Sequence, residues 1–294
     1  MKLLIPDYSL AYQLLDSGNG LKLEQFGANR IIRPDSNCVW SPKLSINEWN
    51  KADACYGTKG WETKKSFKEP WTITYTMQGS GSDIGVNKIT LALKFSLTSK
   101  NIGLFPEQAA NWAWMVNTIQ NSTTKPNILN LFGYTGAASL FAAAAGAEVC
   151  HVDASKPAIT WARYNQELSH LNEAPIRWIV EDCATFVARE IKRGVKYDAL
   201  IIDPPAFGRD PKGKVFEFEK KIRELMALCK EVLVEKPLFV IFNGYSMGYS
   251  ATVLFNLLRE YFPTEDIEFG ELQIKHHKQD YNLPCSLFAR FSRK

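Results

Sequence analysis

The sequence predicts an α/β fold, in which a mostly parallel sheet ends in an antiparallel hairpin and follows a small N-terminal β-rich domain. Two observations carry this prediction. Strand-like and helix-like runs alternate after residue 126, which is the pattern of parallel strands joined by crossover helices. Two further strand candidates, residues 267–276 and 285–291, have no helix between them and are therefore expected to pair antiparallel at the sheet edge.

The length of the chain suggests more than one domain. Its 294 residues correspond to about two domains at roughly 150 residues each. We divide it into a small β-rich domain over residues 1–98, a connecting helix over 99–125 and an α/β domain over 126–294. The first part carries short alternating apolar segments separated by turn signals such as Gly18-Asn19-Gly20. We regard this small domain as a candidate for substrate recognition.

The expected elements follow one another in a regular order. In the small domain the expected strands are residues 21–27, 29–34, 71–77 and 88–97. Residues 103–120 place Pro106 near a helix start and continue with apolar residues at helical spacing. In the α/β domain we expect strands at 127–132, 148–153, 176–180, 197–203 and 237–243, and helices at 138–146, 155–168, 184–192, 215–235 and 250–262.

Composition and charge restrict the class of protein. Hydrophobic residues make up 46% and charged residues 22% of the chain, as in ordinary globular proteins, and no run of ~18 apolar residues predicts a membrane span. Pro6 and Asp7 interrupt the N-terminal segment before the apolar core of a signal peptide could form, so we expect no export. The six cysteines are scattered and form no CxxC pair, which indicates a reduced, cytoplasmic setting and no metal site. The net charge of +4 arises within residues 1–100, which permits a polyanionic partner without requiring one.

The first strand of the α/β domain leads into a candidate cofactor site. Gly133 and Gly136 bracket the turn into the next helix, where glycine permits positive φ and a close approach of backbone to a ligand. The helix directs its free N–H groups at the same place, and Asp153, at the end of the second strand, is suited to accept hydrogen bonds from both ribose hydroxyls. The alternative is that the glycines only make a tight turn and Asp153 only caps a helix. Leu131 stands where a dinucleotide-binding motif has glycine, which disfavours NAD.

Five motifs in order resemble a known family. They are GLFPEQ (103–108), LNLFGYTGAASL (129–140), HVDASKPAI (151–159), VEDCATF (180–186) and DPPAFGR (203–209). Over residues 100–294 the chain resembles class I S-adenosylmethionine-dependent methyltransferases, and among them the bacterial 23S rRNA methyltransferases with a Rossmann-like C-terminal domain. The first ~95 residues do not resemble the RNA-binding PUA domain of some members.

The resemblance implies a set of cofactor-binding residues. The turn from Asn130 to Gly136 would hold the methionine part, Asp153 the ribose, and Asp182 with the N–H of Cys183 the adenine. Asp182 is also suited to cap the helix that follows it, and both roles are compatible. The complete set is Phe105, Gln108, Asn130, Phe132, Gly133, Tyr134, Thr135, Gly136, Asp153, Ala154, Ser155, Asp182 and Cys183. For Phe105, packing in the core is an equal alternative.

The motif DPPAF predicts the acceptor site. It places Asp203 at the end of the fourth strand, and the consecutive Pro204 and Pro205 leave carbonyl groups that can face a target amino group. Phe207 is a candidate for stacking on a flipped base, although Ala206 occupies the position at which related motifs carry the aromatic residue. No cysteine follows the fourth or fifth strand, as C5 methylation of a pyrimidine would require. We therefore favour a purine nitrogen as the acceptor.

An RNA substrate is the expected partner. The segment 57–71 interleaves Lys64 and Lys65 with Trp61, Phe67 and Trp71, a composition suited to phosphate contact and base stacking, or else a solvated strand edge kept soluble by lysines. Two other functions remain open, namely a methyltransferase for a small molecule or protein, and an inactive RNA-binding module. We expect no membrane partner, and the sequence leaves the oligomeric state open.

Overall fold

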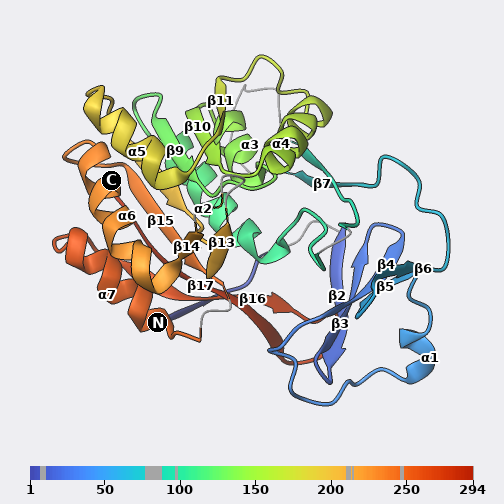
Figure 1. Cartoon of the computed structure of the whole chain (residues 1–294). Helices are drawn as coiled ribbons and strands as arrows, with labels where there is room; N and C mark the ends of the chain where they lie inside the picture. Colours follow the sequence, from blue (N-terminus) through green and yellow to red (C-terminus); the bar gives the residue numbers. More distant parts are fainter. Residues whose placement is uncertain are drawn as a thin grey trace.

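The computed structural model describes residues 1–6, 11–76, 88–96, 99–209, 213, 215–245 and 248–293. Its centre is an eight-stranded sheet with the order β1-β16-β17-β15-β12-β9-β10-β11 (Figure 1). The strands are β1 (Lys2–Leu4), β9 (Asn127–Leu131), β10 (Glu148–Asp153), β11 (Ile176–Val180), β12 (Ala199–Ile202), β15 (Phe239–Gly244), β16 (Glu268–Lys275) and β17 (Asn282–Ser292). Strands β11, β10, β9, β12 and β15 are parallel, whereas β17 runs antiparallel to both of its neighbours. The predicted α/β fold with a terminal hairpin is confirmed.

The edge of the sheet differs from the prediction. The hairpin β16–β17 forms as expected, but β1 pairs parallel with β16 and lies outside it, with Lys2 opposite Gly270. A Cβ atom at Gly270 would lie 1.7 Å from the Lys2 carbonyl oxygen, so this pairing depends on glycine. The sequence analysis missed β1 because three residues are too few to show an alternating pattern.

Helices cover both faces of the sheet. One face carries α2 (Ala109–Gln120), α3 (Ala137–Ala144) and α4 (Lys156–Leu168), and the other carries α5 (Cys183–Lys192), α6 (Phe218–Val232) and α7 (Ala251–Tyr261) (Figure 1). A separate apolar cluster fills the space on each side. From β9 the chain proceeds to β10 and β11 on one side and then returns to β12 on the other, so the strand order reverses next to β9. Ligands bind at such a switch point in open α/β sheets.

The N-terminal part forms a five-stranded sheet of its own. Its order is β2-β3-β4-β5-β6, with β2 (Tyr12–Gly18), β3 (Leu21–Phe26), β4 (Asn29–Pro34), β5 (Ala54–Gly57) and β6 (Gly60–Thr63), and it carries the short helix α1 (Ile46–Trp49). Asn19 and Gly20 have φ values of 52° and 76°, as a two-residue hairpin turn between β2 and β3 requires. The predicted β-rich region is confirmed.

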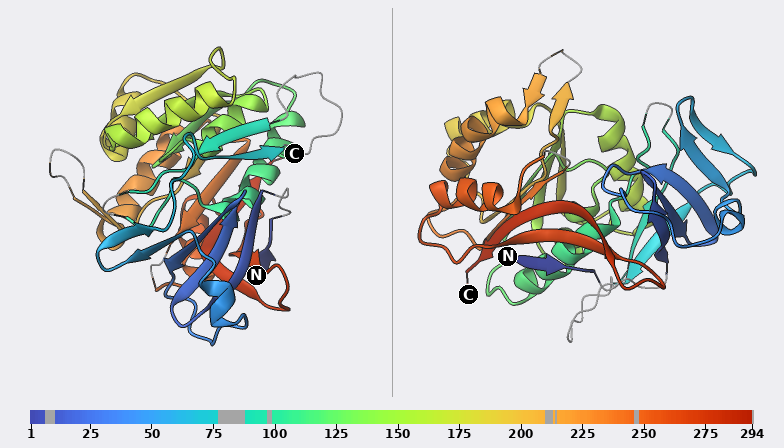
Figure 2. Two further views of the ribbon diagram at one scale, coloured as in Figure 1. Left: turned by 90° about the vertical axis from the view of Figure 1, so that its right-hand side faces the viewer. Right: turned by 90° about the horizontal axis from the view of Figure 1, so that it is seen from below.

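Two connections join this sheet to the large one. The hairpin β7 (Thr72–Thr76) and β8 (Lys88–Ala92) packs on α4, where Asn165 Oδ1 accepts from the Ala92 N–H at 2.8 Å. The tip of the β16–β17 hairpin reaches β2, where the His277 N–H donates to the Leu14 carbonyl at 2.8 Å (Figure 2). The division of the chain at residue 98 stays a prediction.

No helix among the described residues is long and apolar enough to cross a membrane.

Candidate active site

A cavity of about 950 Å³ opens at the carboxyl ends of β9, β10 and β12. The proposed cofactor residues Phe105, Gln108, Asn130, Phe132, Gly133, Tyr134, Thr135, Asp153, Ala154, Ser155, Asp182 and Cys183 line it, as do the proposed acceptor residues Asp203, Pro204, Pro205 and Phe207. Gly136 is the exception. A Cβ atom at Gly136 would lie against the side chains of Ala162 and Trp178. Gly136 is the N-cap residue of α3 and has a left-handed φ of 85°, which glycine adopts readily. The structure therefore brings nearly all of the predicted residues together, while their individual roles stay predictions.

The turn between β9 and α3 carries unusual backbone conformations. Phe132 and Tyr134 have φ values of 57° and 51°, a left-handed region that costs non-glycine residues about 1–3 kcal/mol each. Gly133 does not have the positive φ that the sequence suggested, while a close approach of a ligand there stays a prediction. A Cβ atom there would lie 2.3 Å from Cε1 of the buried His151 ring, so glycine makes room for a side chain of β10.

Asp153 holds this turn in place. Its Oδ2 accepts from the Tyr134 N–H at 2.9 Å, and its Oδ1 accepts from the Ser155 N–H at 2.8 Å. Burial raises the pKa of this carboxyl, and the two N–H donors partly counteract that effect. Each carboxylate oxygen retains a second lone pair, so the group can still accept from two hydroxyls of a ligand in the cavity.

Asp182 has one of its two predicted roles in the structure, that of a helix cap, and its contact with adenine stays a prediction. Its Oδ1 accepts from the Thr185 N–H at 3.0 Å, so it is the N-cap of α5. It also lines the cavity together with Cys183, the first residue of that helix. Burial raises the pKa of the Cys183 thiol well above its usual range, which keeps the sulfur protonated.

Asp203 lies at the acceptor end, directly after β12. Its Oδ1 is buried and has no hydrogen-bond partner among the described residues. Burial, with a smaller contribution from Glu107, raises the pKa of this carboxyl to about 7. An orphaned buried acceptor is rare in folded proteins, and at a cavity wall it indicates a donor supplied by a ligand. Phe207, at the start of β13 (Phe207–Arg209), is 60% exposed at the same wall.

The sequence analysis missed a buried polar network beside Asp203. The Tyr245 hydroxyl donates to Glu107 at 2.8 Å, and Gln108 Nε2 donates to the Tyr245 oxygen at 3.2 Å. Asn111 Nδ2 donates to Asn243 Oδ1 at 2.9 Å and to Gln108 Oε1 at 3.0 Å. Asn111 comes from α2, Asn243 from β15 and Tyr245 from the position after β15, while Glu107 and Gln108 precede α2. Of these residues the sequence predicted only Gln108 as part of the site, through the motif GLFPEQ.

The segment 57–71, which is rich in lysine and aromatic residues, makes many of its contacts within the small domain. Trp61, Phe67 and Trp71 pack around Phe95 at ring-centroid distances of 4.4, 4.7 and 5.3 Å. The Lys64 ammonium donates to the Asn50 carbonyl at 2.7 Å, and Lys65 pairs with Asp53 at 3.0 Å. Trp71 belongs to the domain interior, whereas Trp61 and Phe67 are half-buried, so both alternatives for this segment stay predictions.

Comparisons with known proteins agree with this geometry. A model of the family described as Conserved hypothetical protein 95 matches residues 106–247. Ribosomal RNA large subunit methyltransferase K/L of Desulfotalea psychrophila is 32% identical over 141 residues, 47% of this chain and 19% of that protein. The protein of the same name from Colwellia psychrerythraea is 36% identical over 213 residues, 69% of this chain and 27% of that protein. The chain spans about a fifth of the length of the first curated relatives it matches.

Solved structures resemble the chain over its whole length. A structure from Streptococcus mutans, with 18% identity, a TM-score of 0.68 and coverage of 95% of this chain and 75% of that one, shares the fold. A second structure is described as the SAM-dependent methyltransferase from Agrobacterium tumefaciens. It is 37% identical, has a TM-score of 0.90 and covers 100% of this chain and 94% of that one. Together with the cavity at the switch point of the sheet, this likeness shows that the chain belongs to the class I S-adenosylmethionine-dependent methyltransferases.

Proposed function

We propose that the protein methylates a base nitrogen of RNA, with ribosomal RNA as the substrate. The single observation that carries the acceptor chemistry is the orphaned Oδ1 of Asp203 at the cavity wall. An amino group would supply the donor that this oxygen lacks, and Pro204 and Pro205, whose carbonyl groups could also accept from it, line the same cavity. The RNA substrate is supported by the names of the relatives, which are ribosomal RNA methyltransferases.

The cavity fits the cofactor of the family. Asp153 would accept hydrogen bonds from the ribose hydroxyls, Asp182 and Cys183 would contact the adenine, and the turn 130–135 would hold the methionine part. When bound, S-adenosylmethionine supplies an activated methyl group on its sulfonium sulfur. The protein's own contribution is then alignment of the acceptor nitrogen, exclusion of water and a base for the proton that the acceptor releases.

Asp203 has two tasks in this scheme. It accepts a hydrogen bond from the amino group, which directs the nitrogen lone pair at the methyl carbon. As the nitrogen–carbon bond forms and the carbon–sulfur bond breaks, the nitrogen becomes cationic and releases a proton. A carboxylate with a pKa of about 7 is suited to take up this proton near neutral pH. We place this reaction in the cytoplasm.

The direct test compares RNA from parent cells with RNA from cells that lack the protein. Mass spectrometry of rRNA and tRNA nucleosides should reveal one methylated purine that is absent from the deletion strain. The purified protein with tritiated S-adenosylmethionine should restore that nucleoside in RNA from the deletion strain. Transfer to protein or small molecules but not to RNA would favour the alternative substrates. Absence of cofactor binding by calorimetry would favour an inactive RNA-binding module.

A further inference from the structure

The cavity extends past the acceptor residues to the N-terminal sheet. Lys22 of β3, Arg33 of β4 and Lys100 line this far end, together with the turn Asp35–Asn37 and Asn101. Glu107 and the acceptor carboxyl of Asp203 line the same cavity as these cations. The charges of Lys22 and Arg33 lower the pKa of the Glu107 carboxyl, whereas burial raises it.

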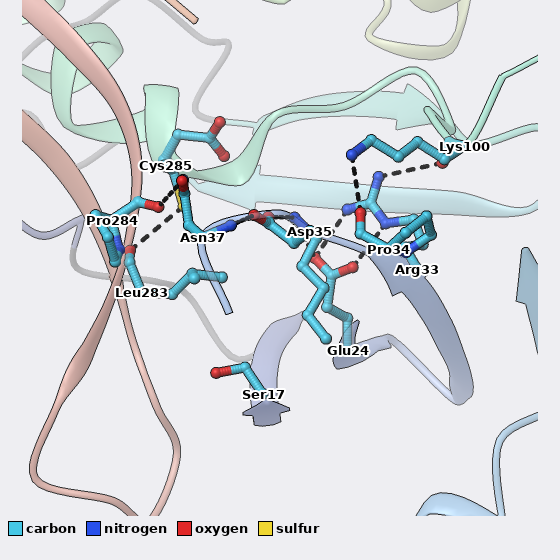
Figure 3. A network of polar contacts seen from close by, with 12 residues as sticks. Ser17, Glu24, Arg33, Pro34, Asp35, Asn37, Lys100, Leu283, Pro284 and Cys285 are labelled. Atoms are coloured by element: carbon cyan, nitrogen blue, oxygen red, sulfur yellow. Dashed lines mark hydrogen bonds and ion pairs between the residues drawn. The ribbon is translucent and has the colours of Figure 1, made fainter. Parts of the chain in front are cut away.

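Two of these cations are held by carboxylates. Arg33 donates to both oxygens of the buried Glu24, from Nε at 2.7 Å and from a terminal nitrogen at 2.8 Å (Figure 3). Lys22 lies 3.2 Å from Asp35 and 3.8 Å from Glu24. Arg33 is therefore a fixed structural cation, and Lys22 is shared between two acids.

Lys100 differs from both. Its side chain is exposed, and its ammonium donates to the Pro34 carbonyl at 2.8 Å (Figure 3). Among the described residues it has no carboxylate at ion-pair distance, and an ammonium has three donors, so two remain available. Burial of its surroundings lowers its pKa, and the like charges of Lys22 and Arg33 add to that effect. An anion at this position would relieve the repulsion among the three cations.

We propose that Lys100, supported by Lys22, forms a phosphate subsite for the acceptor nucleotide, so that the N-terminal sheet holds the RNA backbone while the base extends toward Asp203. This inference rests on the proposed RNA substrate and assigns the N-terminal sheet its role in recognition. Phosphate contacts of this kind fix the register of a nucleic acid, whereas contacts to the base specify it. One cavity thus presents a carboxyl that suits the amino group of a nucleotide and ammonium groups that suit its phosphate.

The test uses the full chain and RNA from the deletion strain. Lys100→Gln removes the charge, Lys100→Arg keeps it, and Lys43→Gln removes another exposed lysine that does not line the cavity. We measure KM for RNA at several salt concentrations, kcat, and cofactor affinity by calorimetry. Thermal melting establishes that each variant is folded.

Lys100→Gln should raise KM for RNA about fivefold to tenfold at low salt and reduce the slope of log affinity against log salt by about one, as expected for one lost phosphate contact. Its kcat and cofactor affinity should stay within about twofold of the parent, and Lys100→Arg and Lys43→Gln should behave like the parent. Parental KM and salt slope in Lys100→Gln would overturn the subsite while leaving the proposed function intact. A parent protein that methylates no RNA would instead overturn the proposed function, and the subsite with it.

Discussion

Replacing Asp203 by asparagine should make the protein more stable and much less active. The carboxyl has a pKa of about 7 against an ordinary value of 3.8, because burial disfavours its ionised form. Each tenfold change in proton affinity corresponds to about 1.4 kcal/mol, so ionisation of Asp203 lowers the free energy of unfolding by at most ~4 kcal/mol. Asparagine has nearly the same shape and carries no charge, so it should remove this penalty.

The sign of the effect depends on pH. Between pH 3.8 and about 7 the folded chain binds more protons than the unfolded chain at this site, so the stability of the parent falls as the pH rises. The stability advantage of Asp203→Asn should grow by ~2–3 kcal/mol between pH 5 and pH 8. Urea denaturation of both proteins at these two pH values measures this difference. An equal difference at both pH values would refute the assignment of the raised pKa.

The activity of the two proteins supplies the second readout. The transfer rate of the parent should rise tenfold per pH unit below about pH 7 and then level off, as the carboxylate forms. Asp203→Asn should lose this pH dependence and about 10²-fold to 10⁴-fold in rate, with unchanged cofactor affinity. A variant that keeps the parental rate would show that the ionised carboxylate is not needed.

Three further substitutions test other parts of the structure. Asp153→Ala should weaken S-adenosylmethionine binding by ~1.5–3 kcal/mol in calorimetry, and an unchanged affinity would remove Asp153 from the ribose site. Gly133→Ala should lower the free energy of unfolding by ~1–3 kcal/mol because the new methyl group overlaps the His151 ring, and a parental melting curve would contradict this packing. Glu24→Gln should cost ~3–5 kcal/mol in urea denaturation, since it leaves the Arg33 guanidinium buried without its anion, and a neutral result would mean that water reaches this pair.

The sequence predicted the site best where strands end. Asp153 and Asp203 follow β10 and β12, and the carboxyl ends of parallel strands meet at one edge of a sheet, so their convergence follows from the alternation of strands and helices. The reason for Gly133 was not predictable, because the His151 ring that occupies its space comes from the next strand. Motif spacing also says nothing about packing against a distant segment.

The cations at the far end of the cavity could not be predicted from the sequence for a different reason. Lys22 and Arg33 belong to the small domain, and their position beside Glu107 depends on how the two sheets dock. That docking uses contacts between residues more than 200 positions apart, such as the donation from Asn37 Nδ2 to the Pro284 carbonyl at 2.9 Å. Local patterns predict elements, and such contacts decide their relative placement.

The strand order also constrains how the protein is made. Strand β1 emerges first from the ribosome, yet its partner β16 is synthesised some 260 residues later, and β17 must then insert between β16 and β15. The large sheet therefore cannot be completed before residue 292 has been synthesised, and β15 keeps an unpaired edge until then. Pairing between such distant segments is slow, because the entropy of closing a long loop is lost before the contacts form. A nascent chain stalled before residue 268 would expose this edge of β15. Pairing of β16 and β17 is therefore the folding step that protects the protein from aggregation through this edge.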